Sequence, residues 1–193
     1  AVNPTGSMKL VKTTEDGQNL SGWKFGIYSD SGCSNLISGP HTTDSTGTLS
    51  VSNLIEGTVY VKELGHTDAS VAALYTCDSA NPQKVTITAG ATATVNFHNR
   101  LNTGGVKLVK ETNTGKNLDG WQIGLYTNAA CTKPISGSPF TTGADGSVTV
   151  SDLSVGTLYA KEIEVDDPYW VCDTSVKTVN ITAGQTATVT FRN

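Results

Sequence analysis

The chain contains the same long segment twice. The run KLVKTTEDGQNLSGWKFGIYSDSGC, which begins at Lys9, returns as KLVKETNTGKNLDGWQIGLYTNAAC, which begins at Lys107, at an offset of 98. The run TAGATATVNFHN, which ends at Asn99, returns as TAGQTATVTFRN, which ends at Asn193. A long unit that recurs along a chain is expected to fold twice into the same structure.

This repeat predicts two domains, residues 1–100 and 101–193. Units of about 90 to 100 residues lie in the common size range of domains. The boundary falls in the short polar stretch 100–105, RLNTGG, which is expected to restrict the motion between the two units.

Within each unit the apolar side chains follow a period of two. Trp23, Phe25 and Ile27 alternate with other residues, and turn-forming residues separate several such short runs. This pattern is typical of β-strands and not of helices. The sequence therefore predicts an all-β fold of two tandem immunoglobulin-like β-sandwich domains.

Charge and hydropathy exclude several partners. The 13 Lys and Arg against 17 Asp and Glu give a net charge of −4 without a basic cluster, so neither nucleic acid nor an anionic membrane is an expected partner. No run of 18 apolar residues is present, so no membrane insertion is expected. The opening AVNPTGSM lacks the pattern of a signal peptide, which suggests a mature protein or an excised piece.

Four cysteines divide evenly between the repeats. Cys33 and Cys77 lie in the first unit, and Cys131 and Cys172 in the second, which favours one disulfide inside each domain. Disulfides would place the protein in an oxidising compartment outside the cytoplasm. The alternative is four buried free thiols.

No metal or other cofactor is expected. The cysteines lack a Cys-x-x-Cys spacing, and the three histidines, His41, His66 and His98, align with Phe140, Val165 and Arg192 in the other unit. A metal site repeated in both domains is therefore not predicted.

Polar residues occupy the inward positions of three strands in each repeat. Met8 and Leu10 share a strand face with Lys12, because successive side chains of a strand point to opposite faces. The same parity applies to an acid and an amide further along the unit. The three positions are Lys12, Glu63 and Asn99 in the first repeat, and Lys110, Glu162 and Asn193 in the second. A strand end that emerges into solvent would explain any one of them. A triple that recurs at matched positions in both copies favours inward-facing residues instead.

The ordered motifs resemble those of tandem Cna-B-type domains, also called SpaA-like or prealbumin-like domains, of Gram-positive surface proteins and pilins. The resemblance rests on LVKTTEDG and LVKETNTG, then NLSGW and NLDGW, then GTVYVKE and GTLYAKE, and finally VNFHN and VTFRN. These motifs cover nearly the whole chain, in the same order in both repeats.

The resemblance implies a prealbumin-like fold and an intramolecular isopeptide bond in each domain. By position, the bonds would join Lys12 to Asn99 and Lys110 to Asn193, assisted by the acids Glu63 and Glu162. A buried lysine is a better nucleophile because burial favours its neutral form. A buried acid is expected to hold a proton, donate a hydrogen bond to the Asn amide oxygen, and carry protons as ammonia leaves.

Such bonds suit a structural protein better than an enzyme, because the self-crosslinking occurs once per domain. The expected function is a stalk or backbone segment of a bacterial surface adhesin or pilus-like protein, extracellular and attached to the cell wall through a region outside this sequence. Its expected partners are neighbouring domains of a larger surface protein. The alternative is direct binding of host matrix protein or glycan through the aligned aromatics Tyr75 and Trp170, which lie beside the second cysteine of each repeat. Packing of these two side chains against the disulfides is the favoured interpretation of the pair.

Overall fold

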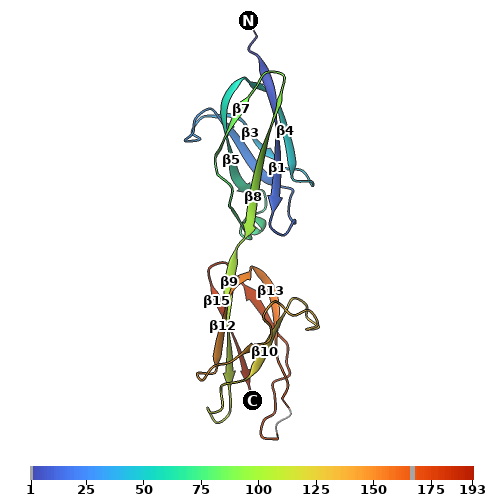
Figure 1. Ribbon diagram of the computed structural model, residues 1–193, viewed down its shortest axis with the longest axis vertical. Coiled ribbons are helices and arrows are strands. Elements are labelled where there is room, and N and C mark those ends of the chain that lie inside the picture. The colour runs from blue at the N-terminus through green and yellow to red at the C-terminus, as the bar shows by residue number, and fades with distance from the viewer. Residues whose placement is uncertain (1, 166–167) are drawn as a thin grey trace. The chain divides into compact units, whose positions relative to one another are not determined.

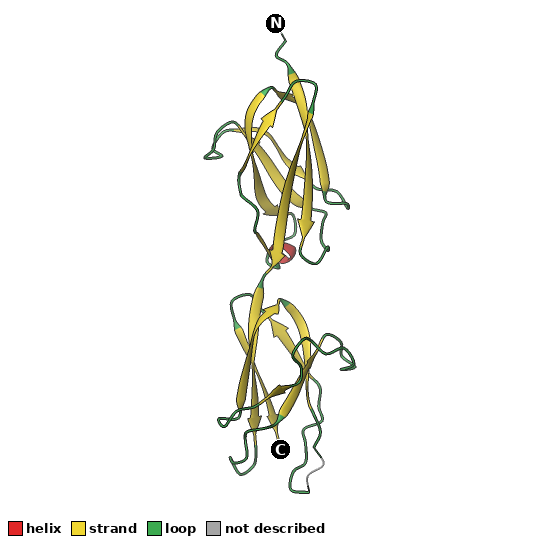
Figure 2. Cartoon of the chain, viewed as in Figure 1, coloured by secondary structure: helices red, strands yellow, loops and turns green. Residues whose placement is uncertain are grey.

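A computed structural model describes residues 2–165 and 168–193 of the chain. The chain separates into two compact units, residues 1–101 and 102–193, which we call domain 1 and domain 2. Strands account for nearly all of the regular structure in both units, and the helix α1 has only four residues (Figures 1 and 2). The predicted all-β class is confirmed.

Domain 1 consists of two four-stranded sheets that enclose one apolar core. The sheet orders are β4-β1-β8-β6 and β3-β2-β5-β7. The elements are β1 Thr5–Thr14, β2 Trp23–Tyr28, β3 Leu36–Thr42, β4 Thr48–Ile55, β5 Gly57–His66, α1 Ala69–Ala72, β6 Tyr75–Cys77, β7 Gln83–Ile87 and β8 Thr92–Leu101.

Domain 2 repeats this architecture with a smaller first sheet. Its sheet orders in the described residues are β12-β9-β15 and β11-β10-β13-β14. The strands are β9 Thr103–Glu111, β10 Gln122–Tyr126, β11 Phe140–Thr141, β12 Ser147–Ser154, β13 Gly156–Glu162, β14 Lys177–Ile181 and β15 Thr186–Arg192.

The first and last strands of each domain are parallel neighbours. In domain 1 β1 lies beside β8, with Lys12 opposite Phe97 and Thr14 opposite Asn99 (Figure 1). In domain 2 β9 lies beside β15, with Lys110 opposite Phe191. This pairing brings residues near the two ends of each repeat to the same end of one sheet.

Alternation along β1 decides which side chains enter the core. Buried residues alternate strictly with more exposed ones along the strand, and Met8, Leu10 and Lys12 all lie on the buried face. Lys12 is therefore held in the core by the same period that buries the apolar residues before it. It is one of the largest fully buried side chains of the protein, as is Lys110 in domain 2.

Candidate functional site

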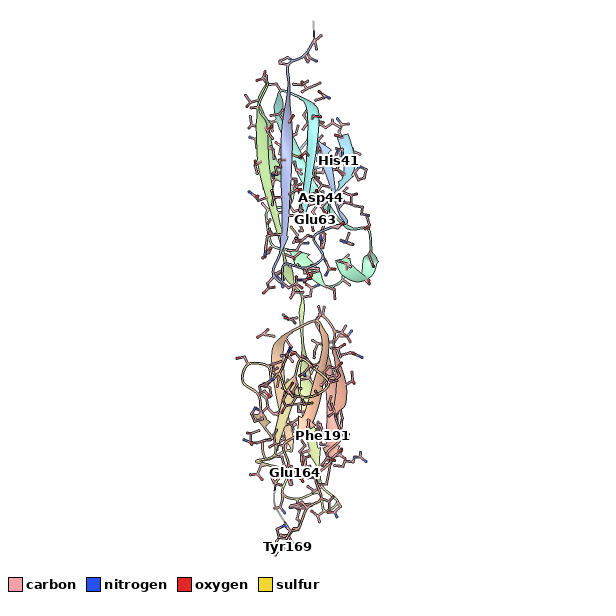
Figure 3. The ribbon with its side chains drawn as sticks, turned by 90° about the vertical axis from the view of Figure 1, so that its right-hand side faces the viewer. His41, Asp44, Glu63, Glu164, Tyr169 and Phe191 are labelled. Carbon is pink, nitrogen blue, oxygen red and sulfur yellow. The ribbon has the colours of Figure 1, made fainter. Side chains whose placement is uncertain are left out.

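The site in domain 1 is a buried lysine that meets a glutamate from the opposite sheet. Lys12 extends from β1 and is 1% exposed, whereas Glu63 extends from β5 and is 8% exposed. The Lys12 Nζ donates a hydrogen bond to Glu63 Oε2 at 2.5 Å. The contact joins the two sheets through the core, in the region where Figure 3 labels Glu63.

Asn99 completes the site from β8, beside β1. It is 1% exposed, and its Nδ2 donates to Glu63 Oε1 at 2.8 Å. The two oxygens of Glu63 thus contact the lysine amine and the asparagine amide at the same time. The backbone N–H of Glu63 donates to Asn81 Oδ1 at 2.9 Å, which fixes the strand at this point.

Domain 2 builds the same arrangement from matching strands. The Lys110 Nζ donates to Glu162 Oε2 at 2.5 Å, and the Asn193 Nδ2 donates to Glu162 Oε1 at 2.8 Å. Lys110 and Glu162 are 1% and 2% exposed. The structure therefore brings together all three sequence-predicted residues of each repeat.

Tryptophan covers the amine in both domains. The Lys12 Nζ lies 4.5 Å from the ring centroid of Trp23, and the Lys110 Nζ lies 4.2 Å from that of Trp121. These rings attract the cationic form of the amine and separate it from solvent. Sequence reasoning did not assign them to the site, although the repeated Asn-Leu-x-Gly-Trp motif was a usable signal.

That motif positions the ring through its own backbone. Asn19 adopts a left-handed conformation with φ of 54°, and its carbonyl accepts the indole N–H of Trp23 at 2.7 Å. Gly22 has φ of 93°, and a Cβ there would come within 2.7 Å of the His66 ring. The turn therefore needs a residue without a side chain immediately before the tryptophan.

Burial changes the acid–base chemistry of the lysine. Desolvation lowers the pKa of Lys12 below its ordinary value of 10.5, and the hydrogen bond and charge of Glu63 oppose this shift. Desolvation acts in this direction because a low-dielectric environment disfavours the ammonium. A larger fraction of Lys12 is thus available as the neutral, nucleophilic amine.

The carboxylate contacts differ from the sequence expectation in one respect. Glu63 was expected to donate a hydrogen bond to the amide oxygen, whereas in the structure it accepts one from the amide nitrogen of Asn99. A carboxylate can accept from both neighbours at once because it has two oxygens. This geometry lets one carboxyl group take a proton from the amine and deliver it to the departing nitrogen.

Of the aligned aromatics, Tyr75 packs inside domain 1, whereas Trp170 is partly exposed and packs against Trp121. Tyr75 is 5% exposed and contacts Trp23 edge to face at a centroid distance of 5.8 Å, and Trp170 contacts Trp121 at 6.0 Å. The Tyr75 hydroxyl also donates to Asp16 at 2.9 Å. The expected alternative of an exposed Tyr75 in a binding surface is therefore wrong, because this residue backs the tryptophan over Lys12.

Neither expected disulfide is present. Cys33, Cys77, Cys131 and Cys172 are all free thiols, partly exposed. The Cys33 thiol contacts the carbonyl of Ser31, in the turn after β2, while the Cys77 thiol contacts the carbonyl of Ser79, after β6. The sulfurs of Cys33 and Cys77 thus each have a polar contact within their own turn.

In the described part of the chain, no group of three or more His, Cys, Asp or Glu side chains is arranged to hold a metal ion. No helix of residues 2–165 and 168–193 is long and apolar enough to cross a membrane.

Comparison with known proteins agrees with this architecture. The SpaA prealbumin-like fold domain matches residues 6–101 and, a second time, residues 104–193. The chain belongs to this family. Its two SpaA domains account for nearly the whole sequence, which confirms the resemblance inferred from the repeated motifs.

Among solved structures, one shares the fold of the SpaA tandem, and two pilins are more distantly similar. The Bacillus anthracis TIE protein is 22% identical, with a TM-score of 0.73 over 98% of this chain and 34% of that one. A streptococcal ancillary pilin is 21% identical over 100% of this chain and 63% of its own, with a TM-score of 0.43. The minor pilin GBS52 of Streptococcus agalactiae is 17% identical over 97% of this chain and 95% of its own, also with a TM-score of 0.43. This chain thus spans about a third of the TIE protein chain. No curated protein matches it.

Proposed function

We propose that each domain forms an intramolecular isopeptide bond, between Lys12 and Asn99 in domain 1 and between Lys110 and Asn193 in domain 2. The observation that carries this proposal is the buried carboxylate that bridges amine and amide with the same two distances in both domains. An unreacted ion pair buried this deeply would be costly, whereas an amide carries no charge.

The reaction balances with the groups present. Glu63 takes a proton from the Lys12 ammonium, and the neutral Nζ attacks Cγ of Asn99 to form the new C–N bond. Glu63 then delivers this proton to Nδ2 while the old C–N bond breaks, and ammonia leaves. The second proton lost by Nζ remains on Glu63, so the products are a neutral secondary amide, a protonated Glu63 and ammonia. The fold contributes a high effective concentration of the two reactants.

The bond would have a mechanical role. Lys12 and Asn99 lie on the first and last strands of domain 1, which are parallel neighbours. Tension that enters through β1 would cross the new bond into β8 and leave the domain without extending the residues between them. The rate of forced unfolding is set by a kinetic barrier to separating the strands. A covalent bond between the two strands would prevent that separation.

We therefore assign the chain to the stalk or backbone of a Gram-positive bacterial surface protein, pilus-like or adhesin, extracellular and anchored to the cell wall through another region. Its partners would be neighbouring domains of the same or adjoining surface proteins. The disulfides are not carried into this proposal because all four cysteines are free thiols in the structure.

Intact mass spectrometry tests the proposal directly. The folded chain is expected to weigh less than its sequence by two molecules of ammonia, and peptide mapping should show a Lys12–Asn99 and a Lys110–Asn193 branched peptide. In Glu63→Ala the mass deficit should fall to one molecule of ammonia, and the Lys110–Asn193 branched peptide should still be present. A folded wild-type chain at full sequence mass would refute the proposal.

A second candidate is ligand binding by domain 2, which one observation favours. A surface pocket of about 970 Å³ lies beside Trp121 and Trp170 and is also lined by Tyr169, which is 86% exposed near the end of domain 2 (Figure 3). An aromatic ring beside polar side chains suits a sugar or a peptide. Glycan and matrix-protein arrays probed with wild type and with Tyr169→Ala test this candidate, and equal signals from both proteins would count against it.

A further inference from the structure

The two sites differ at the amide oxygen of the reacting asparagine. The Asn193 Oδ1 accepts a hydrogen bond from the backbone N–H of Asp173 at 2.9 Å. The Asn99 Oδ1 is buried and has no hydrogen-bond partner among the described residues. The Glu contacts of the two amides have equal lengths, although Asn99 is fully buried and Asn193 is partly exposed.

The difference arises from strand pairing in domain 1. The residue that matches Asp173 is Asp78, which directly follows Cys77 as Asp173 directly follows Cys172. The N–H of Asp78 donates to the backbone carbonyl of His98 at 3.1 Å, in continuation of the β6–β8 ladder. In the described residues of domain 2 no strand corresponds to β6, and the N–H of Asp173 turns to the side chain instead.

The Asp173 N–H also fixes the orientation of the amide. An Asn193 amide turned by 180° would direct its Nδ2 hydrogens at this N–H and its oxygen at the carboxylate of Glu162. The observed orientation places a donor on the oxygen and an acceptor on the nitrogen, so both ends are satisfied. Among the described residues of domain 1, only the contact with Glu63 orients the Asn99 amide.

We infer that the backbone N–H of Asp173 is an oxyanion donor for isopeptide formation, and that the domain 2 bond therefore forms faster than the domain 1 bond. This inference rests on the function proposed above. When the Lys110 Nζ attacks Cγ of Asn193, the carbonyl electron pair moves onto Oδ1. A donor already 2.9 Å from that oxygen stabilises the developing charge. The pair returns to re-form the carbonyl as Nδ2 departs with the proton from Glu162.

The two rates can be measured in the same tube. Chain recovered from inclusion bodies in denaturant would be diluted rapidly into native buffer at neutral pH, which starts folding and then the reaction in both domains. Acid-quenched samples, digested and analysed by mass spectrometry, give the branched peptide of each domain against time. Removal of one oxyanion donor typically costs about 10²–10³ in rate, so we expect domain 2 to react about 10²-fold faster than domain 1.

A matched pair of variants isolates the N–H. Asp173→Pro removes the donor, whereas Asp173→Ala keeps it and removes only the carboxylate. The proline variant should react in domain 2 about 10²-fold more slowly than the alanine variant, with the domain 1 rate unchanged in both. Near-ultraviolet circular dichroism reports whether domain 2 has folded. If the proline variant fails to fold, the ratio of the two wild-type rates remains a complete test.

The outcomes separate this inference from the function on which it rests. Equal rates in the two wild-type domains, a faster domain 1, or folded proline and alanine variants with equal domain 2 rates would each overturn the role of Asp173. Absence of both branched peptides from the folded wild type would instead overturn isopeptide formation itself.

Discussion

Replacing the ion pair of domain 1 by neutral groups tests the covalent bond through the sign of a stability change. In the double variant Lys12→Met/Glu63→Gln, methionine fills a similar volume without the reactive amine. The glutamine keeps an oxygen that can accept the Asn99 Nδ2, whose present bond to Glu63 is 2.8 Å long. The matched control is Lys9→Met, at an exposed position of the same strand.

The expected magnitude follows from the loop that the bond closes. The bond between Lys12 and Asn99 spans 87 positions (99 − 12), and a loop of this length restricts the unfolded chain by about 4–5 kcal/mol at 25 °C. Losing the bond should lower the free energy of unfolding of domain 1 by about that amount. For a domain of this size the midpoint of thermal unfolding should fall by about 20 °C or more.

Without a covalent bond the same substitution has the opposite expected sign. Exchange of a buried ion pair for neutral groups is often neutral or stabilising by about 1–4 kcal/mol, because it removes the cost of desolvating two charges. In the crosslinked protein this gain is absent, since the acylated Lys12 carries no charge. The sign therefore distinguishes a bonded from an unbonded pair.

Urea unfolding followed by hydrogen-exchange mass spectrometry assigns each transition to a domain. The double variant should destabilise domain 1 alone, and Lys9→Met should leave both domains near wild type. A double variant whose domain 1 is as stable as that of the wild type, or more stable, would refute the reasoning.

Three other results are expected. Single-molecule pulling from the termini should show no unfolding step of domain length in the wild type. One such step is expected in Lys12→Met and two in Lys12→Met/Lys110→Met. A domain-length step in the wild type would contradict the proposed force path. Trp23→Leu should slow bond formation in domain 1 because water reaches the amine, and the time course of the branched peptide measures this against unchanged domain 2. In the uncrosslinked Asn99→Ala variant, the amine of Lys12 keeps a pKa that burial lowers below 10.5. Between that pKa and 10.5 the unfolded chain binds more protons than the folded chain. The free energy of unfolding should therefore rise with pH across this window. Urea titrations at several pH values check this, and Asn99→Ala/Lys12→Met, which lacks the titrating amine, should lack that rise.

Some contacts of the site could not be predicted from the alternation of residues along a single strand. The period of two identified Lys12 and Glu63 as inward-facing, but not that they meet from opposite sheets, because parity fixes a face and not a partner. The tryptophan over each amine was missed for a related reason. A Trp in an alternating run predicts only a core residue, and its contact with Lys12 depends on the turn from Asn19 to Gly22.

For the cysteines, the sequence predicted a contact that the structure does not contain. Their even division between the repeats favoured a disulfide in each domain, yet the structure holds Cys33 and Cys77 in separate turns as free thiols. Sequence spacing gives the number of possible pairs, whereas the distance and direction between two sulfurs depend on how the loops pack.

The sequence by itself determined the domain repeat, the all-β class, and the three inward polar positions in each copy, because these follow from self-similarity and from the two-residue period of strands. Only the tertiary structure decided that β1 and the last strand are parallel neighbours, and that a carboxylate bridges Lys and Asn. It also decided that Asp173 faces Asn193 while Asp78 faces the backbone of His98. The two aspartates have matching places in the repeat, and the direction of each N–H depends on whether the chain beside it forms a strand.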